Sequence, residues 1–270
     1  MRSSYAMRSS YDMKSPLISI IIPSYNKAKY IEKTLQSIVT QKNANFEVII
    51  QDGGSTDGTL DIIKKYAKKY ANLISYVSKK DGGQLDAINK GFKKAKGDVV
   101  TFINADDEYE LGALETVTGY FTENPNALWF AGKAVVIDEN NMEIAKVATW
   151  YKNILLSFDL YGLLLIVNYL MQPSVFISKT ALNKHGSFTG TKFAVMEYDM
   201  WLKIGRYEMP VVINKVLSKF RLEKDTKTST NSRKLLIDDE KIVKKYTKNN
   251  LILFLHILHN YFRVIMQKII

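Results

Sequence analysis

Four short apolar runs alternate with stretches of helical spacing in the first hundred residues, and this alternation constrains the fold more than any other feature. The runs are rich in β-branched residues and lie at 17–22, 46–50, 73–77 and 99–103. Helical spacing separates them at 28–41, 58–70 and 84–95. A short apolar run between turn signals is typical of a strand buried on both faces. Strands that alternate with helices in this way predict an α/β fold with a doubly wound, mostly parallel sheet.

A polar cluster follows each apolar run. The clusters are Pro23-Ser24-Tyr25-Asn26, Asp52, Lys80-Asp81-Gly82-Gly83 and Asn104-Ala105-Asp106-Asp107. Ligands of open α/β sheets bind beyond the carboxyl ends of the strands. We therefore expect these clusters, which are distant in the sequence, to converge on one edge of the sheet and to form a binding site there.

Two interpretations are open for each of four carboxylates in or beside these clusters, those of Asp52, Asp86, Asp106 and Asp107. Asp106 directly follows a buried strand, a position that suits a divalent cation bound together with the phosphates of a ligand; the alternative for Asp106 and Asp107 is a helix N-cap. Asp52 suits a hydrogen bond from a nucleobase or a ribose hydroxyl, or else it satisfies its own turn. Asp86 lies one helical turn before Lys90, and the alternative to a ligand contact is a surface ion pair.

The composition limits what such a site can hold. The 270 residues include no cysteine and three histidines, so a metal ion would be bound mainly by oxygen, which favours magnesium or manganese. The net charge of +11 fits a lysine-rich surface, or binding to nucleic acid, to an anionic membrane or to a phosphorylated substrate. Nucleic acid is disfavoured, because the carboxylates at the strand ends would repel its phosphates unless a metal ion is bound.

The second half of the chain is less regular. Strands are expected over 128–138 and 211–220, and an apolar helix over 152–168. Residues 241–270 hold six Lys or Arg and no Asp or Glu, and their polar side chains recur every three or four residues. A basic amphipathic helix of this kind suits a membrane interface; packing on its own domain or in a homodimer is the alternative. Residues 1–16 repeat a short polar unit and are expected to form a disordered leader.

In order and spacing, these motifs resemble the N-terminal domain of the family 2 glycosyltransferases, which have the GT-A fold. The resemblance rests on residues 19–26, 49–59, 81–91 and 95–107, and Gln172-Pro173-Ser174 and 197–202 resemble signatures of the family's acceptor side. It covers residues 17–222. It implies a Rossmann-like half at 17–110 that binds the nucleotide sugar, an acceptor-side half with mixed strands at 111–222, and a basic loop with an amphipathic helical tail at 223–270.

The resemblance also implies roles for individual residues. Those that would bind the nucleotide sugar are Pro23, Ser24, Tyr25, Asn26, Asp52, Gly83, Asp86, Asn104 and Ala105. Asn104-Ala105-Asp106 stands where the family has its Asp-X-Asp motif, with Asp106 as the metal ligand. Asn104 departs from the motif, although its amide oxygen can still accept from ribose. Glu223 replaces the histidine of the family's Arg-X-His motif and is the second candidate ligand for manganese or magnesium.

The implied reaction is an inverting transfer from a nucleoside-diphosphate sugar to a saccharide or polyprenyl-linked saccharide in surface polysaccharide synthesis. A carboxylate would remove the proton of the acceptor hydroxyl while the metal ion stabilises the departing diphosphate. Glu197 is the predicted base and Asp199 the second candidate; the alternative is that both complement the N-terminus of a helix. We expect a cytoplasmic protein that binds the inner face of the membrane peripherally through residues 241–270.

Three other functions stay open. A nucleotidyltransferase would share the fold but carry a Gly-rich loop and an arginine after the first strand, where this chain has Pro23-Ser24-Tyr25-Asn26. A nucleic-acid-binding module would bind oligonucleotides in a salt-sensitive manner. A protein that binds sugar nucleotides without transferring the sugar would be consistent with Asn104 and Glu223, which both depart from the motifs of the family.

Overall fold

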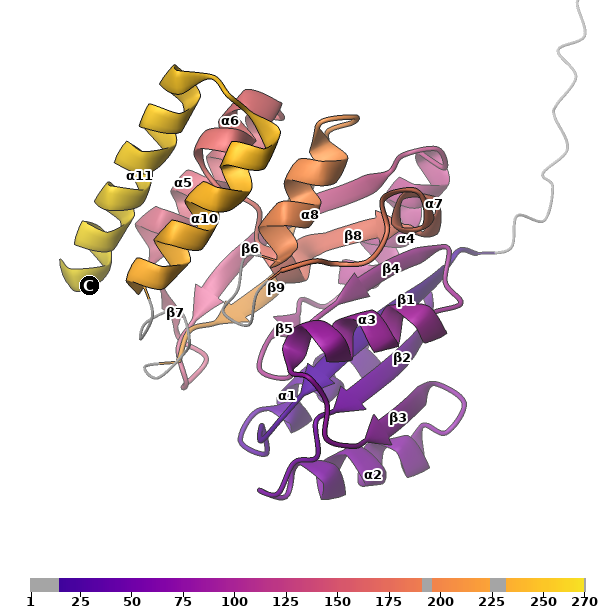
Figure 1. The fold of residues 1–270 in the computed structure, drawn as a ribbon. Coiled ribbons are helices and arrows are strands. Elements are labelled where there is room, and N and C mark those ends of the chain that lie inside the picture. Colours follow the sequence, from indigo (N-terminus) through magenta and orange to yellow (C-terminus); the bar gives the residue numbers. More distant parts are fainter. Residues whose placement is uncertain (1–14, 191–195, 224–231, 270) are drawn as a thin grey trace, which may run out of the picture.

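The computed structural model describes residues 15–190, 196–223 and 232–269. Residues 1–14 of the expected leader and most of the basic loop after Glu223 lie outside these ranges. The described residues form one nine-stranded sheet with helices on both faces (Figure 1). The strands are β1 (Leu17–Ser24), β2 (Asn45–Asp52), β3 (Ile74–Ser78), β4 (Val99–Phe102), β5 (Glu108–Tyr109), β6 (Trp129–Ile137), β7 (Glu143–Ile144), β8 (Val175–Ser178) and β9 (Val211–Arg221).

The helices follow the strands in the alternating order that the sequence predicts for the first half. They are α1 (Ile31–Val39), α2 (Thr59–Lys69), α3 (Gln84–Lys94), α4 (Ala113–Glu123), α5 (Lys146–Phe158), α6 (Tyr161–Ile166), α7 (Lys179–His185), α8 (Met196–Gly205), α10 (Ser232–Tyr246) and α11 (Asn250–Ile269). A 3-10 turn at Gln172–Ser174 precedes β8.

The first half of the sheet is parallel and the second half is mixed. The strand order is β3-β2-β1-β4-β8-β6-β9-β5, with β7 paired to β6. Strand β1 pairs in parallel with β2 and β4, and β2 pairs in parallel with β3. Strand β8 runs antiparallel to β4 and β6, whereas β9 runs parallel to β6. The predicted α/β fold is confirmed.

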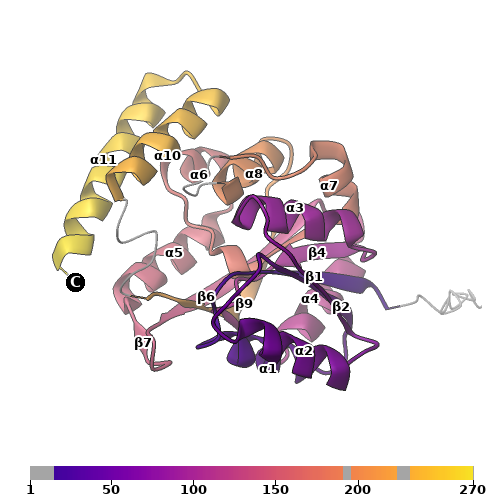
Figure 2. The ribbon, with the colours of Figure 1, turned by 60° about the horizontal axis from the view of Figure 1, so that its bottom comes forward.

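Strand β1 shows why the apolar runs become central strands. Ile18, Ile20 and Ile22 pack on one face with α1, α2 and α4, whereas Ile21 packs on the other face with α3. All four side chains are fully buried. A strand that is apolar at consecutive positions needs helices on both faces, and Figure 2 shows α1 and α2 on one side of the sheet and α3 on the other.

The single helix expected at 152–168 is wrong. Helix α5 ends at Phe158, Asp159 adopts a φ of 48°, and α6 begins at Tyr161. A left-handed residue cannot continue a right-handed helix, so the chain turns there. The tail consists of two helices, α10 and α11, where one was expected. Within the described ranges, no helix is long and apolar enough to cross a membrane.

Substitution of Gly91 tests the close packing of α3 on β1. A β-carbon at Gly91 would lie 2.4 Å from Cγ2 of Ile21, so we expect Gly91→Ala to lower the free energy of unfolding by about 1–3 kcal/mol. The matched control is Gly119→Ala in α4, where a β-carbon meets nothing within 4 Å and should stabilise the helix by about 0.5–1 kcal/mol. Urea denaturation measures both changes. Equal effects of the two substitutions would contradict the packing argument.

Candidate active site

The loops after β1 and β2 bind each other at the carboxyl edge of the sheet, as predicted. The amide of Gly53 donates to the carbonyl of Ser24 at 2.8 Å. The amide of Asn26 donates to Oγ of Ser55 at 2.9 Å, and Oδ1 of Asn26 accepts from the amide of Thr56 at 2.9 Å. These bonds leave the neighbouring Tyr25 ring 62 % exposed, so an aromatic face is free to stack on a ligand at this edge.

Asp52 organises the loop that follows it. Its buried carboxylate accepts from the amides of Gly54 and Ser55 at 3.1 and 3.0 Å and from the hydroxyls of Ser55 and Ser78 at 2.5 and 2.6 Å. These bonds agree with the interpretation that Asp52 satisfies its own turn. Its contact with a nucleoside stays a prediction.

The turn before α3 lies against the same loops. A β-carbon on Gly53 would meet Oδ1 of Asp81 and Cδ2 of Tyr25, both at 3.3 Å. Asp86 accepts from the amide of Gly82 at 2.9 Å and from Nζ of Lys90 at 2.6 Å. These two bonds, that with Lys90 first, lower the pKa of Asp86. The surface ion pair considered from the sequence is therefore formed, and the expected contact with ribose or diphosphate stays a prediction.

Asn104 and Asp107 fix the loop that carries Asp106. Oδ1 of Asn104 accepts from Nε2 of Gln84 at 2.7 Å, and Nδ2 of Asn104 donates to Asp107 at 3.0 Å. Asp107 is fully buried and accepts from the amide of Arg221 at 2.8 Å. Burial and the charge of Asp106 raise the pKa of Asp107 well above its ordinary value. The helix-cap interpretation of Asp107 is wrong, because α4 begins only at Ala113.

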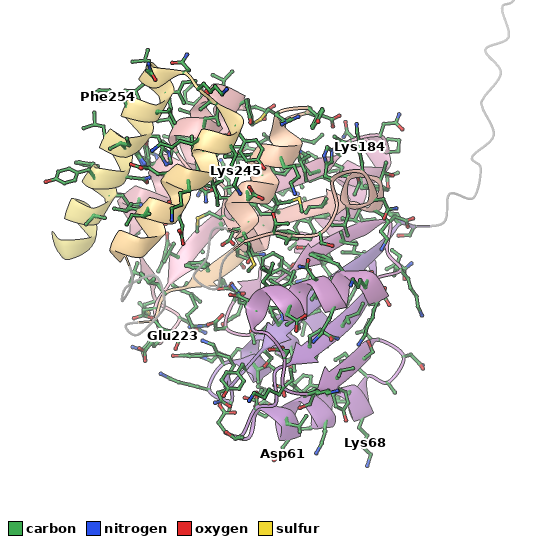
Figure 3. All side chains as sticks on the ribbon, viewed as in Figure 1. Asp61, Lys68, Lys184, Glu223, Lys245 and Phe254 are labelled. Carbon is green, nitrogen blue, oxygen red and sulfur yellow. The ribbon has the colours of Figure 1, made fainter. Side chains whose placement is uncertain are left out.

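Lys27 joins the two predicted metal ligands. Its Nζ lies 2.5 Å from Oδ2 of Asp106 and 2.5 Å from Oε1 of Glu223. Burial by itself lowers the pKa of Lys27, but the two carboxylates outweigh burial and leave the pKa raised. Lys27 was not among the site residues predicted from the sequence, although it directly follows the polar cluster that ends at Asn26. Figure 3 labels Glu223 at the border between the two halves of the chain.

Arg221 places Glu223 beside the loop of Asp106. Its buried guanidinium donates to the carbonyls of Asp106 and Asp138 at 2.9 and 2.6 Å and to Glu108 at 2.5 Å. It also lies 4.9 Å from the ring centroid of Tyr30. The end of β9 is therefore tied to the loop after β4, and Glu223 follows two residues later.

The donor set fits a hard divalent ion that shares its shell with phosphate. Oδ2 of Asp106 and Oε1 of Glu223 are close enough together for both to contact the ammonium of Lys27 at 2.5 Å. Within the described ranges, no group of three or more His, Asp or Glu side chains is arranged to bind a metal. Magnesium typically uses one or two carboxylates and takes its remaining ligands from substrate phosphates and water, so two carboxylates suffice for such an ion when a diphosphate is present.

Glu197 and Asp199 lie in the first turn of α8 with different surroundings. Oε2 of Glu197 is buried and has no hydrogen-bond partner among the described residues. Burial raises the pKa of Glu197, the charge of Asp239 adds to the rise, and Lys152 opposes it. Asp199 instead accepts from Thr189 at 2.6 Å, from Lys245 at 3.3 Å and from Tyr246 at 3.1 Å. The carboxylate of Asp199 thus joins α8 to α10, whereas no residue that the structure describes donates a hydrogen bond to Oε2 of Glu197.

Comparison with known sequences gives one family. The model of Glycosyl transferase family 2 matches residues 19–186. The putative teichuronic acid biosynthesis glycosyltransferase TuaG of Bacillus subtilis (strain 168) is 35% identical over 124 residues, which are 46% of this chain and 49% of TuaG. An uncharacterised glycosyltransferase of Rickettsia typhi is 28% identical over 257 residues, which are 92% of this chain and 78% of that protein. The chain thus aligns with about half the length of TuaG.

Solved structures share the fold. S. aureus TarS in complex with UDP-GlcNAc gives a TM-score of 0.61 at 20% identity, over 85% of this chain and 71% of that chain. The mannosyltransferase PcManGT from Pyrobaculum calidifontis, in complex with GDP-Man and Mn2+, gives 0.68 at 19% identity, over 92% of this chain and 70% of that chain. The expected GT-A fold is confirmed.

Lys27→Met tests whether the ammonium and a metal ion compete for the same two carboxylates. Without the ammonium, Asp106 and Glu223 keep their negative charges and lose their counter-charge, so we expect Mn²⁺ to bind at least about tenfold more tightly in the absence of donor. Calorimetric titration with MnCl₂ measures the affinity. The control combines Lys27→Met with Glu223→Gln and should lose the gain. An unchanged affinity in Lys27→Met would show that the ion binds elsewhere.

Proposed function

The chain belongs to glycosyl transferase family 2, and from this premise we propose that it transfers a sugar from a nucleoside-diphosphate sugar to a saccharide or lipid-linked saccharide acceptor. The observation that carries the proposal is the convergence of the loops after β1, β2 and β4 on one edge of the sheet, with Lys27, Asp106 and Glu223 beside them. The TarS and PcManGT structures hold UDP-GlcNAc and GDP-Man, which supports a nucleotide sugar as donor.

For donor binding, we assign the nucleoside to the loops after β1 and β2. The exposed ring of Tyr25 offers a stacking surface, and the bonds of Asn26 and Asp52 hold both loops in shape without the ligand. Gly83 takes a φ of 99° directly before α3. The N-terminus of that helix suits the negative charge of a diphosphate.

For the departing nucleoside diphosphate, we assign charge stabilisation to Asp106, Glu223 and Lys27. A manganese or magnesium ion bound by the two carboxylates would take up negative charge as the bond to the sugar breaks. Once the ion takes the two carboxylates, Lys27 would lie beside it and bring a second positive charge to the diphosphate, since the ordinary pKa of a lysine is well above neutral pH.

For the acceptor, we assign the general base to Glu197, with Asp199 as the second candidate. The base takes the proton of the acceptor hydroxyl, whose oxygen displaces the diphosphate at the anomeric carbon with inversion. Burial raises the pKa of Glu197, which brings it closer to the working pH of a general base. The carboxylate of Asp199 is already engaged by three donors, which favours Glu197.

We further propose that the transferred sugar is a hexose or an N-acetylhexosamine, and that the acceptor is a saccharide of a cell-surface glycan used on the cytoplasmic side of the membrane. The name of TuaG refers to teichuronic acid biosynthesis, which supports this class of product. A polyprenyl-linked acceptor would require the protein to work at a membrane surface, which residues 241–270 suit by their charge.

The test of the proposed function is a panel of nucleotide sugars assayed with and without Mn²⁺. We expect one donor to raise the melting temperature in a metal-dependent manner and to release nucleoside diphosphate when an acceptor is added. Asp106→Asn should remove the metal dependence, and Glu197→Gln should keep donor binding but lower turnover about 10²–10⁴-fold. The matched control is Asp61→Asn, an exposed carboxylate on α2, which should change neither.

Three other results of these assays would change the assigned function or the assigned base. Donor binding without release of diphosphate by any acceptor would support the alternative of a non-transferring sugar-nucleotide-binding protein. Full turnover by Glu197→Gln would show that another group is the base. Binding of oligonucleotides in place of every donor would contradict the proposal as a whole.

Lys152→Met tests the electrostatic control of Glu197. Lys152 opposes the rise in the pKa of Glu197, so its removal should raise that pKa further. A general base acts when deprotonated, so the acidic limb of the kcat–pH profile should move to higher pH. Burial lowers the pKa of Lys152 itself to about 8, so the wild-type and variant profiles should converge above that pH.

The control for this profile is Lys152→Arg, which keeps the positive charge and should keep the acidic limb in place. A uniform loss of kcat at every pH would instead indicate that Lys152 acts only through packing.

A further inference from the structure

Helix α11 turns polar side chains inward. His256 and Asn260 are buried, with Nδ1 of His256 3.0 Å from the carbonyl of Ile166 and Nδ2 of Asn260 2.9 Å from Nε2 of His256. Arg263 donates to the buried Asp239 of α10 at 2.8 Å. A surface helix of a globular protein usually directs its polar side to water. Helix α11 has the reverse orientation, because its polar side faces the protein.

The outer side of α11 is apolar. Its exposed residues are Leu251, Phe254, Ile257, Leu258, Tyr261 and Phe262. Their spacing of three, four and seven places them along one side of the helix. Phe254 is 61% exposed, and Figure 3 shows it on the outer side of α11, away from the sheet.

Helix α5 adds a second apolar strip beside it. Its exposed residues are Val147, Trp150, Tyr151, Ile154 and Phe158, which again share one side of a helix. The ring of Tyr151 stacks on the ring of His259 in α11, with centroids 6.2 Å apart. The two helices therefore adjoin, and we call the exposed apolar side chains of both the α5–α11 face.

A face of this kind needs an apolar partner. Exposed apolar side chains that gather on two adjoining helices are uncommon on monomeric soluble proteins and mark interaction or membrane sites. Its aromatic members include Trp150, Tyr151 and Tyr261, the residue types that are enriched where membrane meets water.

The charges around the face favour an anionic lipid surface over a second copy of the chain. Residues 146–158 and 250–269 contain Lys and Arg but no Asp or Glu, and the exposed carboxylates of Glu143 and Asp159 lie just outside the two ends of α5. Lys146 and Lys248 are exposed at the starts of the two helices. A second copy would bring another net charge of +11 against these lysines, whereas anionic headgroups neutralise them.

We propose that the α5–α11 face binds the surface of an anionic membrane, with α11 lying in the plane of the interface. No described helix can cross the bilayer, so the contact is interfacial. The inference extends the membrane-binding region beyond residues 241–270 to α5. The α5–α11 face lies outside the candidate active site, so membrane binding does not depend on the proposed transfer reaction.

Trp150 reports this contact directly. Of the three tryptophans, Trp129 and Trp201 are 0% and 1% exposed, whereas Trp150 is 65% exposed. Vesicles of phosphatidylglycerol and phosphatidylcholine should shift the fluorescence of the full chain to shorter wavelength and protect it from acrylamide, whereas vesicles of phosphatidylcholine alone should have little effect. Trp150→Phe should lose the signal yet still sediment with the anionic vesicles.

The decisive variant is Phe254→Ser with Leu258→Ser. Both side chains are exposed, so the fold and the melting temperature should be kept, while vesicle binding should fall at least about tenfold. The matched control is Leu111→Ser, which removes a 77% exposed leucine before α4 and should bind as wild type does. Deletion of the tail is a poorer test, because Lys245 and Tyr246 hold Asp199 of α8.

Three results would overturn the proposal: no binding of the wild-type chain to anionic vesicles, unchanged binding of the double variant, or a solution dimer that the double variant dissociates. Turnover of a soluble acceptor should be equal in the wild type and the double variant, which separates a failure of this surface from a failure of the proposed transferase function.

Discussion

The buried guanidinium of Arg221 is the interaction on which the arrangement of the site depends. A buried charge is tolerated only when its hydrogen bonds are satisfied, and Arg221 meets this condition through Glu108 and the carbonyls of Asp106 and Asp138. Asp107 completes the connection by accepting from the backbone of Arg221. A strand from the second half of the chain is thereby fixed to a loop from the first half.

The connection through Arg221 and the packing of the tail each bring charged side chains from different parts of the chain together. In the first, Lys27 lies between two carboxylates that belong to different halves of the chain. In the second, Glu197 lies within the electrostatic reach of Lys152 and Asp239, which come from α5 and α10. The tail therefore contributes to the surroundings of the predicted base, and Asp199 ties it to α8.

The candidate site was predictable to the extent that it lies at strand ends. The apolar runs predicted β1, β2 and β4, and the polar clusters after them do meet at one edge of the sheet. Lys27 was missed because a lysine after a turn has no local signature of its partners. The break at Asp159 was missed because a single residue with positive φ leaves little mark on an apolar pattern.

What the sequence by itself determined is the α/β fold of the first half and the identity of the chemical groups at its edge, because periodicity and turn residues are local properties. Only the tertiary structure decided which groups are partners. Among the described residues, it left Oε2 of Glu197 without a hydrogen-bond partner and surrounded Asp199 with three donors, although both stand in the same helical turn. It also turned His256 and Asn260 inward and Phe254 outward. The pattern of α11 separates a polar from an apolar side, but only the neighbouring elements decide which side is covered.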